Sequence, residues 1–174
     1  MHTIAPLSLF DENKAREFLE AQRWPAQIIC PHCGGGSKVY KLRPRASSLK
    51  GTHVRPGLRK CGKCRKEFTV SVGTIFHNSR IPLHKWLYAY HLLCTAEETV
   101  NAYRLHRALG ITYKSACFML HRLRFAWVRV RRKTAEENFP ELPMGHQSGP
   151  RRSKLPPPIS ELLQVKPPRR RKRR

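Results

Sequence analysis

Apolar residues recur with helical spacing near the start of the chain, in the stretch "SLFDENKAREFLEAQRW". Residues three and four apart lie on one face of a helix, so an apolar stripe at this spacing predicts a packing helix. Ser8 or Asp11 can cap its start. Trp24-Pro25 ends it, since proline disfavours helical backbone in the preceding residue. The expected packing face consists of Ala15, Phe18, Leu19 and Gln22.

A longer helical pattern covers residues 81–127, where three helices are expected. The first is "IPLHKWLYAYHLLC", the second runs from about Thr99 to Leu109, and Gly110 supplies a left-handed turn before the third. Thr112 can cap that third helix, which runs to Trp127. The expected core positions are Leu83, Trp86, Leu87, Tyr90, Cys94, Ala102, Leu105, Leu109, Ala116, Met119, Leu120, Leu123 and Trp127.

The opposite face of the third predicted helix is polar and basic. It is expected to present Lys114, Cys117, His121, Arg122 and Arg124. A helix, a glycine turn and a second helix have the dimensions of a helix-turn-helix, whose second helix contacts base edges with its first residues. The predicted base contacts are Tyr113, Lys114 and Ser115, with Arg104, Arg107, His121, Arg122 and Arg124 as further DNA contacts. A plain packing role for these helices stays open, because two helices around a glycine are common.

Strand periodicity appears between the helical regions. "KVYKL", "GLRK" and "EFTVSV" are short β-type runs, and in the last of them Phe68, Val70 and Val72 alternate with polar residues. The basic, turn-rich stretch "RPRASSLKGTHVRPG" before the second run predicts an exposed hairpin or loop.

Residues 134–174 contain eight prolines and no sustained period, and they end in "RRRKRR". Such a segment buries too little apolar area to offset its ordering entropy, so a disordered tail is expected. The sequence therefore predicts a small α+β protein with four parts: an N-terminal helix (1–27), a four-cysteine ribbon of β-hairpins (28–80), a three-helix helix-turn-helix (81–133) and a tail (134–174).

Four cysteines form two Cys-x-x-Cys pairs, Cys30 with Cys33 and Cys61 with Cys64. Each pair puts two thiolates on one turn, and two such turns joined by a hairpin close a tetrahedral four-sulfur site. The soft ligand set favours one structural zinc ion. A redox dithiol, which would ordinarily occur once at a helix start, and a histidine ligand, His32 or His53, are the weaker alternatives. Cys94 is expected in the core, and Cys117 has no evident partner.

The formal net charge of +24 points to a polyanionic partner. Nucleic acid fits first and an anionic membrane surface second, since the chain has no run of about 18 apolar residues. We expect a cytoplasmic, nucleoid-associated protein in which the thiols stay reduced. The terminal basic run adds sequence-independent phosphate contacts, or serves only as a solubilising tail.

The order of these pieces resembles the N-terminal region of bacterial insertion-sequence transposases with a zinc-ribbon head. "CPHCGG", "FTVSVGTIFHNSRIPLHKW" and "ITYKSACFMLHRLR" carry the resemblance, which covers about residues 9–127. It implies that ribbon and helix-turn-helix dock on the ends of a mobile element, and that the family's zinc ligands map onto Cys30, Cys33, Cys61 and Cys64. Double-stranded DNA is then the expected partner and full-length transposase a further candidate, with neither a membrane nor a small-molecule substrate.

The resemblance also implies an RNase-H-like catalytic domain whose acidic triad holds two metal ions. Only 47 residues follow Trp127, and the chain's one aspartate is Asp11. We therefore expect a truncated, catalytically inactive DNA-binding remnant. A zinc-ribbon transcriptional regulator or RNA-binding protein is the alternative, and an active recombinase completed by a second polypeptide is a weaker one.

Overall fold

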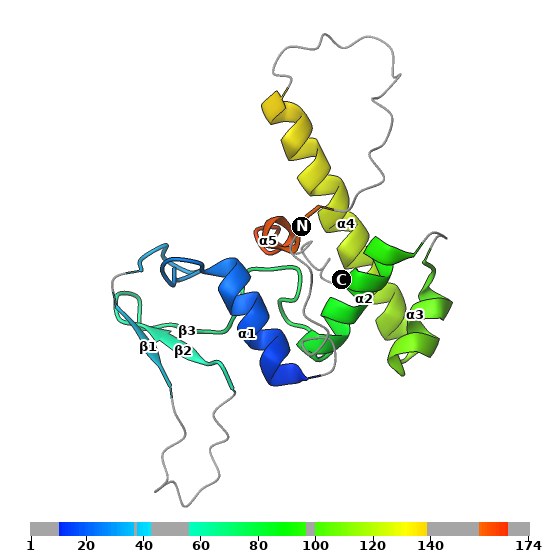
Figure 1. The fold of residues 1–174 in the computed structure, drawn as a ribbon. Coiled ribbons are helices and arrows are strands. Elements are labelled where there is room, and N and C mark those ends of the chain that lie inside the picture. Colours follow the sequence, from blue (N-terminus) through cyan, green and yellow to red (C-terminus); the bar gives the residue numbers. More distant parts are fainter. Residues whose placement is uncertain (1–10, 37, 43–55, 97–99, 139–156, 167–174) are drawn as a thin grey trace, which may run out of the picture.

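The computed structural model describes residues 11–36, 38–42, 56–96, 100–138 and 157–166. Along the chain it forms α1 (Glu12–Arg23), β1 (Val39–Lys41), β2 (Arg59–Cys61), β3 (Glu67–Phe68), α2 (Leu83–Thr95), α3 (Ala102–Leu109), α4 (Tyr113–Asn138) and α5 (Ile159–Leu162). The sheet lies at one end of the molecule and α2, α3 and α4 at the other, with α1 between them (Figure 1). The expected small α+β class is confirmed.

Helix α1 begins and ends as its sequence predicts. The Asp11 side chain accepts a hydrogen bond from the Asn13 N–H at 2.7 Å, which satisfies one of the amides that an α-helix leaves open at its start. Trp24 ends the helix, and Ala15 and Leu19 are fully buried on the expected face. The other candidate cap, Ser8, lies outside the described residues.

The three strands form one antiparallel sheet in the order β1-β2-β3. Strand β3 ends at Phe68, so the prediction of a strand through Val72 is wrong. The chain turns instead: the Val72 N–H donates to the Thr69 carbonyl at 3.1 Å and the Thr74 N–H to the Ser71 carbonyl at 3.2 Å. The alternating valines therefore reflect burial in a series of turns.

Those turns carry the chain from the sheet into the helical core. The buried Thr74 hydroxyl donates to the Ser71 carbonyl at 2.7 Å and accepts from the Phe76 N–H at 3.2 Å. Ile75 and Phe76 are buried as a result, and the Phe76 ring meets the Trp86 ring edge-on at 5.2 Å between centroids. The segment after the ribbon thus shares its core with α2.

The three predicted helices are present, and their expected apolar faces supply the core. Trp86 and Leu87 of α2, Leu105 of α3, and Met119 and Leu123 of α4 are all buried. Within the described residues, no helix is both long and apolar enough to cross a membrane.

Helix α3 starts later than predicted, at Ala102. The Asn101 side chain accepts from the Arg104 N–H at 2.8 Å and caps it. Residues 97–99, where the start was expected, lie outside the described part. Gly110 has the predicted left-handed conformation, with φ 57°.

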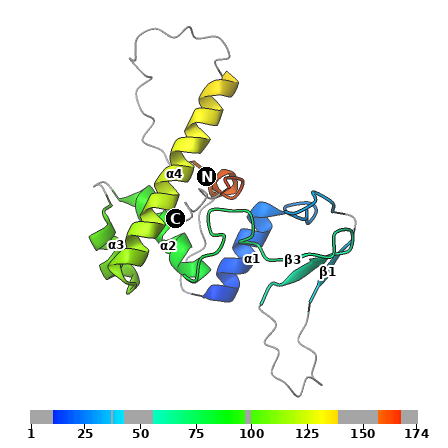
Figure 2. The same cartoon turned by 180° about the vertical axis from the view of Figure 1, so that it is seen from behind.

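Parts of the predicted tail are folded, which corrects the expectation of disorder from Thr134 onward. Helix α4 continues to Asn138 and extends past the body of the molecule, as both Figure 1 and Figure 2 show. Residues 157–166 pack on α4 and α1, with Ile159, Leu162 and Leu163 buried. Residues 139–156 and 167–174 of that predicted tail lie outside the described part.

Tyr90 fixes the start of this packed segment, because its hydroxyl donates to the Pro157 carbonyl at 2.7 Å. Burial is the main reason that the pKa of Tyr90 is raised, so the phenol stays protonated and available as a donor. The segment therefore has a polar anchor as well as an apolar face.

Arg122 does not share the exposed basic face of α4, which corrects a second expectation. Its side chain is 7% exposed, and Nη1 donates to the carbonyls of Ile75 and His77, both at 2.6 Å. The guanidinium also lies over the Phe118 ring, 4.4 Å from its centroid. Arg122 therefore joins α4 to the turns that follow the ribbon.

Replacing Arg122 with methionine keeps most of the side chain's volume but removes its donors. Two carbonyls would lose a charged partner in the interior, so we expect the free energy of unfolding to fall by about 2 kcal/mol or more. Arg132→Met, an exposed position on the same helix, is the control and should change stability little. Denaturant titration of the zinc-loaded proteins measures both; equal midpoints would contradict the assigned contact.

Replacing Leu162 with alanine tests whether the packed segment belongs to the fold. Truncating a fully buried leucine costs about 2–5 kcal/mol where neighbouring groups cannot fill the space. We expect a loss near the lower end, together with faster proteolysis around residues 157–166. Gln164→Ala, an exposed position two residues on, should behave like the wild type. A Leu162→Ala protein as stable and as protease-resistant as this control would show that the segment does not hold the core.

Candidate metal centre

Two similar turns carry the four cysteines. In the first, the Cys30 N–H donates to the Gly35 carbonyl at 3.0 Å; in the second, the Cys61 N–H donates to the Lys66 carbonyl at 3.1 Å, so the same bond closes both turns. The residue directly after each pair is left-handed, with φ 71° at Gly34 and φ 56° at Arg65. Glycine adopts this conformation at no cost, whereas an arginine there is strained and must be held by its surroundings.

The sheet brings the two turns together. The register of β1 against β2 pairs Val39 with Cys61, and the Gly62 N–H donates to the Lys38 carbonyl at 2.6 Å. A Cβ added at Gly62 would lie 2.8 Å from the Lys38 Cβ and 3.0 Å from the Lys38 carbonyl oxygen, so the two backbone segments approach closely at this glycine. The second pair can thus lie beside the first only because residue 62 has no side chain.

The four sulfur atoms form a compact cluster, all within 4.8 Å of one another. Cys30 Sγ lies 3.7 Å from Cys64 Sγ, and Cys33 Sγ lies 3.6 Å from Cys61 Sγ. A tetrahedral zinc site with Zn–S bonds of about 2.3 Å requires sulfur–sulfur separations of about 3.8 Å. The cluster therefore fits one zinc ion, with all four positions filled by protein ligands, which is the arrangement of a structural site.

Hydrogen bonding and burial shift the pKa values of the two thiols in the second pair in opposite directions. The Cys64 amide, followed by the Lys63 amide and neighbouring thiols, lowers the pKa of Cys61 to about 7 against the effect of burial. The Lys66 amide acts to lower the pKa of Cys64, but burial and the other three thiols together raise it to about 11. Without a cation, the cluster thus resists holding four thiolates at once. Zinc binding supplies the positive charge that stabilises the four thiolates, and it displaces the remaining thiol protons.

Aromatic and ionic contacts fix the ribbon to α1. The Trp24 ring meets the Phe68 ring of β3 edge-on, with 5.9 Å between centroids. The Arg59 guanidinium lies 5.7 Å from the centroid of the Trp24 ring. Arg59 Nη2 also lies 2.5 Å from a Glu20 carboxylate oxygen. Arg23 completes the joint, donating to the Val70 carbonyl at 2.5 Å. These contacts set the position of the metal centre relative to the helices, and sequence patterns gave no signal for the arginines.

The predicted DNA contacts fall into separate groups. Tyr113 and Lys114 are exposed at the start of α4, while Ser115 is half-buried and its hydroxyl lies 2.9 Å from that of Thr112. Arg104 and Arg107 are exposed on α3. Arg122 stands apart from all of them, because it is buried.

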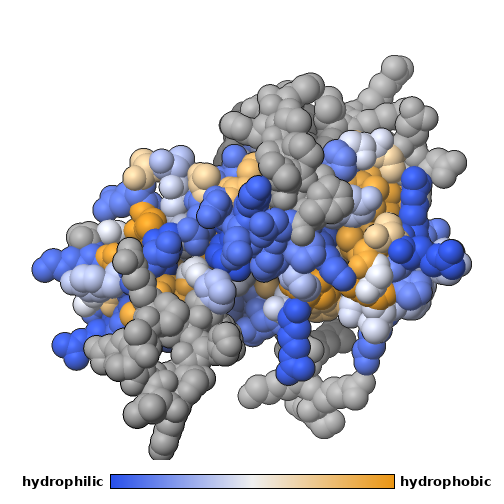
Figure 3. All heavy atoms as spheres, turned by 60° about the horizontal axis from the view of Figure 1, so that its bottom comes forward, coloured by the Kyte–Doolittle hydropathy of each residue, from blue (hydrophilic) through white to orange (hydrophobic). Residues whose placement is uncertain are grey.

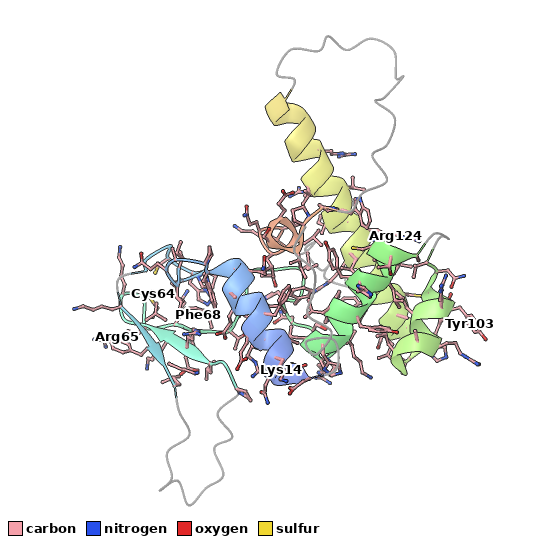
Figure 4. The ribbon with its side chains drawn as sticks, in the orientation of Figure 1. Lys14, Cys64, Arg65, Phe68, Tyr103 and Arg124 are labelled. Atoms are coloured by element: carbon pink, nitrogen blue, oxygen red, sulfur yellow. The ribbon has the colours of Figure 1, made fainter. Side chains whose placement is uncertain are left out.

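His121 and Arg124 lie further along α4, where they line an open hollow of about 570 Å³ together with Asn101 and Val128. Arg124 also donates to the Val100 carbonyl at 3.0 Å, which ties α4 to the start of α3. Figure 4 shows Arg124 within the helical end of the molecule, with Tyr103 pointing outward from α3 and Arg65 at the far end of the ribbon. Exposed cations therefore occur at both ends.

Comparison with known proteins identifies the metal-binding part. Residues 10–67 match the family model described as "Transposase zinc-ribbon domain". The match includes all four cysteines, so these residues are a transposase zinc ribbon positioned to bind one zinc ion. None of the curated proteins or solved structures compared matches the chain.

Replacing Cys61 with serine should abolish zinc binding and unfold the ribbon, because metal binding supplies much of the folding free energy of so small a unit. We expect one zinc per wild-type chain by native mass spectrometry, none in the variant, and a lower melting temperature. Cys117→Ser, a half-buried thiol outside the cluster, should keep its zinc. An unchanged melt for Cys61→Ser would refute the structural role.

Proposed function

We propose that this chain is a DNA-recognition part of an insertion-sequence transposase, with α3 and α4 as a helix-turn-helix that binds duplex DNA at the element ends. The observation that carries the proposal is the exposed start of α4, directly after a left-handed glycine turn, in a chain whose residues 10–67 are a transposase zinc ribbon. The expected division into an N-terminal helix, a ribbon and a helix-turn-helix remains part of this proposal, with α4 extending into the stretch that was expected to be tail.

The turn between the two helices is held from several sides. Thr112 Oγ1 accepts from the Ser115 N–H at 3.3 Å and caps α4. Lys85 of α2 donates to the Leu109 carbonyl at 2.8 Å, and the His106 ring is hydrogen-bonded to the Ile111 carbonyl. A recognition helix must be held at a fixed angle for its side chains to meet base edges, and these contacts supply that support.

The exposed side chains suit a division of labour on DNA. Tyr113, 56% exposed, and Lys114 lie in the first turn of α4, the part of a recognition helix that reaches base edges. Arg104 and Arg107 on the preceding helix are placed for phosphates, which position a protein without reading sequence.

The remaining candidates have more limited roles in the proposal. Because a helix rises about 1.5 Å per residue, Arg124 lies about 16 Å along α4 from Tyr113. His121 and Arg124 therefore suit backbone contacts beyond the bases that the first turn reads. Ser115 supports the cap, and Arg122 positions α4 and is left out of the contact set.

The proposal assigns no strand cleavage to this chain. The transposase match covers only a zinc ribbon, which carries no catalysis. The chain's one aspartate, Asp11, is committed to the cap of α1. A two-metal centre needs a set of carboxylates, whereas the potential metal ligands that cluster within the described residues are the four cysteines. Full-length transposase is the candidate for supplying strand cleavage. The site of action would be the cytoplasm, on the nucleoid.

A regulator or an RNA-binding protein with the same ribbon is the competing proposal. The net charge of +24 favours binding to any nucleic acid, so charge alone does not distinguish the transposase proposal from this competing one. Preference for the element ends over random duplex and over RNA, at one salt concentration, does separate them. Equal binding to all three would mean that the helices read no sequence.

Replacing Lys114 with alanine should weaken binding to the element-end duplex by about 5- to 100-fold, since one good base contact contributes about 1–3 kcal/mol. Zinc content and melting temperature should not change, because the side chain is exposed. Lys14→Ala provides the matched control, an exposed lysine at the lower end of α1 in Figure 4. Equal affinities for the two variants, measured by mobility shift at fixed salt, would remove Lys114 from the contact set.

A further inference from the structure

The sheet of the ribbon has an outer face that no element of the described structure covers. Side chains alternate across a strand, and Arg59 and Phe68, paired by register, both point toward Trp24 at the end of α1. Tyr40 and Lys60, paired with each other, therefore point the opposite way. The outer face comprises Lys38, Tyr40, Leu42, Leu58, Lys60, Gly62 and Glu67.

Tyr40 is the large apolar group of this face. It is 57% exposed, whereas Phe68, the aromatic residue on the other face of the same sheet, is 1% exposed. Its ring is supported from the side: a Cβ added at Gly62 would lie 3.2 Å from Tyr40 Cε2. Because Gly62 has no side chain, the ring can lie close to the backbone of β2 and keep one surface open.

The surroundings of the ring are cationic. Lys60 of β2 lies directly across from Tyr40, and Lys38 lies immediately before β1. Arg65 and Lys66 are exposed in the turn next to these strands, and Figure 4 shows Arg65 at the outer edge of the ribbon. The same face carries one carboxylate, Glu67, so positive charge exceeds negative charge around the ring.

An aromatic ring with one open surface, flanked by Lys38 and Lys60, fits an unpaired nucleobase. Stacking uses the flat face of a base, which is hidden inside a duplex and accessible in a single strand. The lysines then meet the phosphates on either side of the stacked base. A Tyr side chain that only contacted a duplex backbone would not need an open ring surface.

We propose that the outer face of the ribbon, centred on Tyr40, binds an unpaired base, so that the protein prefers duplex DNA with a single-stranded extension over blunt duplex. This inference rests on the proposed DNA-binding function but uses a different surface. Arg65 of the ribbon and Tyr103 of α3 lie at opposite ends of the molecule in Figure 4, so one chain could hold a duplex and an adjoining single strand together. Hydrophilic side chains also spread across the underside that joins these two ends (Figure 3).

The test compares two DNA ligands on the full zinc-loaded chain: a blunt duplex, and the same duplex with a four-nucleotide single-stranded extension carrying 2-aminopurine. We expect the extension to tighten binding, and Tyr40→Ala to remove that gain, a loss of about 5- to 100-fold for one stacked base. Tyr40→Phe should keep the gain, because stacking does not need the hydroxyl group. Quenching of 2-aminopurine should follow the same order.

Tyr103→Ala is the matched control, since Tyr103 is 59% exposed but belongs to α3. It should alter binding to both DNA ligands by the same factor. The proposal is overturned if Tyr40→Ala binds the extended duplex as wild type does, if it weakens both ligands equally, or if Tyr40→Phe loses as much as Tyr40→Ala. Failure of the duplex-binding proposal gives a different result, namely unchanged blunt-duplex affinity in Lys114→Ala.

Discussion

Closure of four thiolates around one ion is the constraint on which the ribbon depends. Its strands have only two or three residues each, far too few backbone hydrogen bonds to hold a sheet in water. Among the described residues from 28 to 68, the buried ones are Cys30, Cys61 and Phe68, so the contact of Phe68 with Trp24 is the main apolar support of this segment. The metal therefore replaces the interior that so short a segment cannot build. Every surface feature of the ribbon, including the open ring of Tyr40, depends on it.

The ribbon is connected to the helices by polar contacts as well as by the shared core. Glu12 of α1 accepts from the His84 N–H at 3.3 Å and lies 3.0 Å from the His84 ring. It supplies the start of α2 with an acceptor that Pro82, the residue at the cap position, cannot provide. Glu12 thus joins α1 to α2, and Arg122 joins the turns after the ribbon to α4. The angle between the metal centre and α4 is thereby set by specific hydrogen bonds.

The chemistry of neighbouring residues predicted much of this structure. The elements that were predicted wrongly or missed depend on contacts between residues far apart in the sequence. The spacing of the cysteines, the cap at Asp11 and the turn at Gly110 follow from the chemistry of neighbouring residues, and all three are confirmed. Strand β3 was predicted too long because alternating valines look the same in a strand and in buried turns. The packed segment at 157–166 was missed because its apolar residues are few, and only a surface offered by α4 and α1 makes their burial worthwhile.

Arg122 could have been placed better from the sequence. It lies three residues after Met119 and four before Ala126, both buried, so helical spacing puts it at the edge of the core. Its charge suggested an exposed face, because arginine is rarely buried without partners. Those partners are carbonyls of a segment far away in the sequence, and nothing in local composition shows where they lie. Tyr40, likewise, cannot be recognised as exposed until the pairing of the strands is known.

The acceptors that hold Arg122 belong to the main chain, and this affects how the protein can change over time. The side chains at positions 75 and 77 can vary within the limits of packing without loss of the two carbonyls, whereas inserting or deleting one residue between them would move both. Substitutions are thus tolerated in this segment, whereas insertions and deletions are not. A ribbon grafted from another protein would keep the orientation of α4 only if its exit had the same number of residues between the last cysteine and these carbonyls.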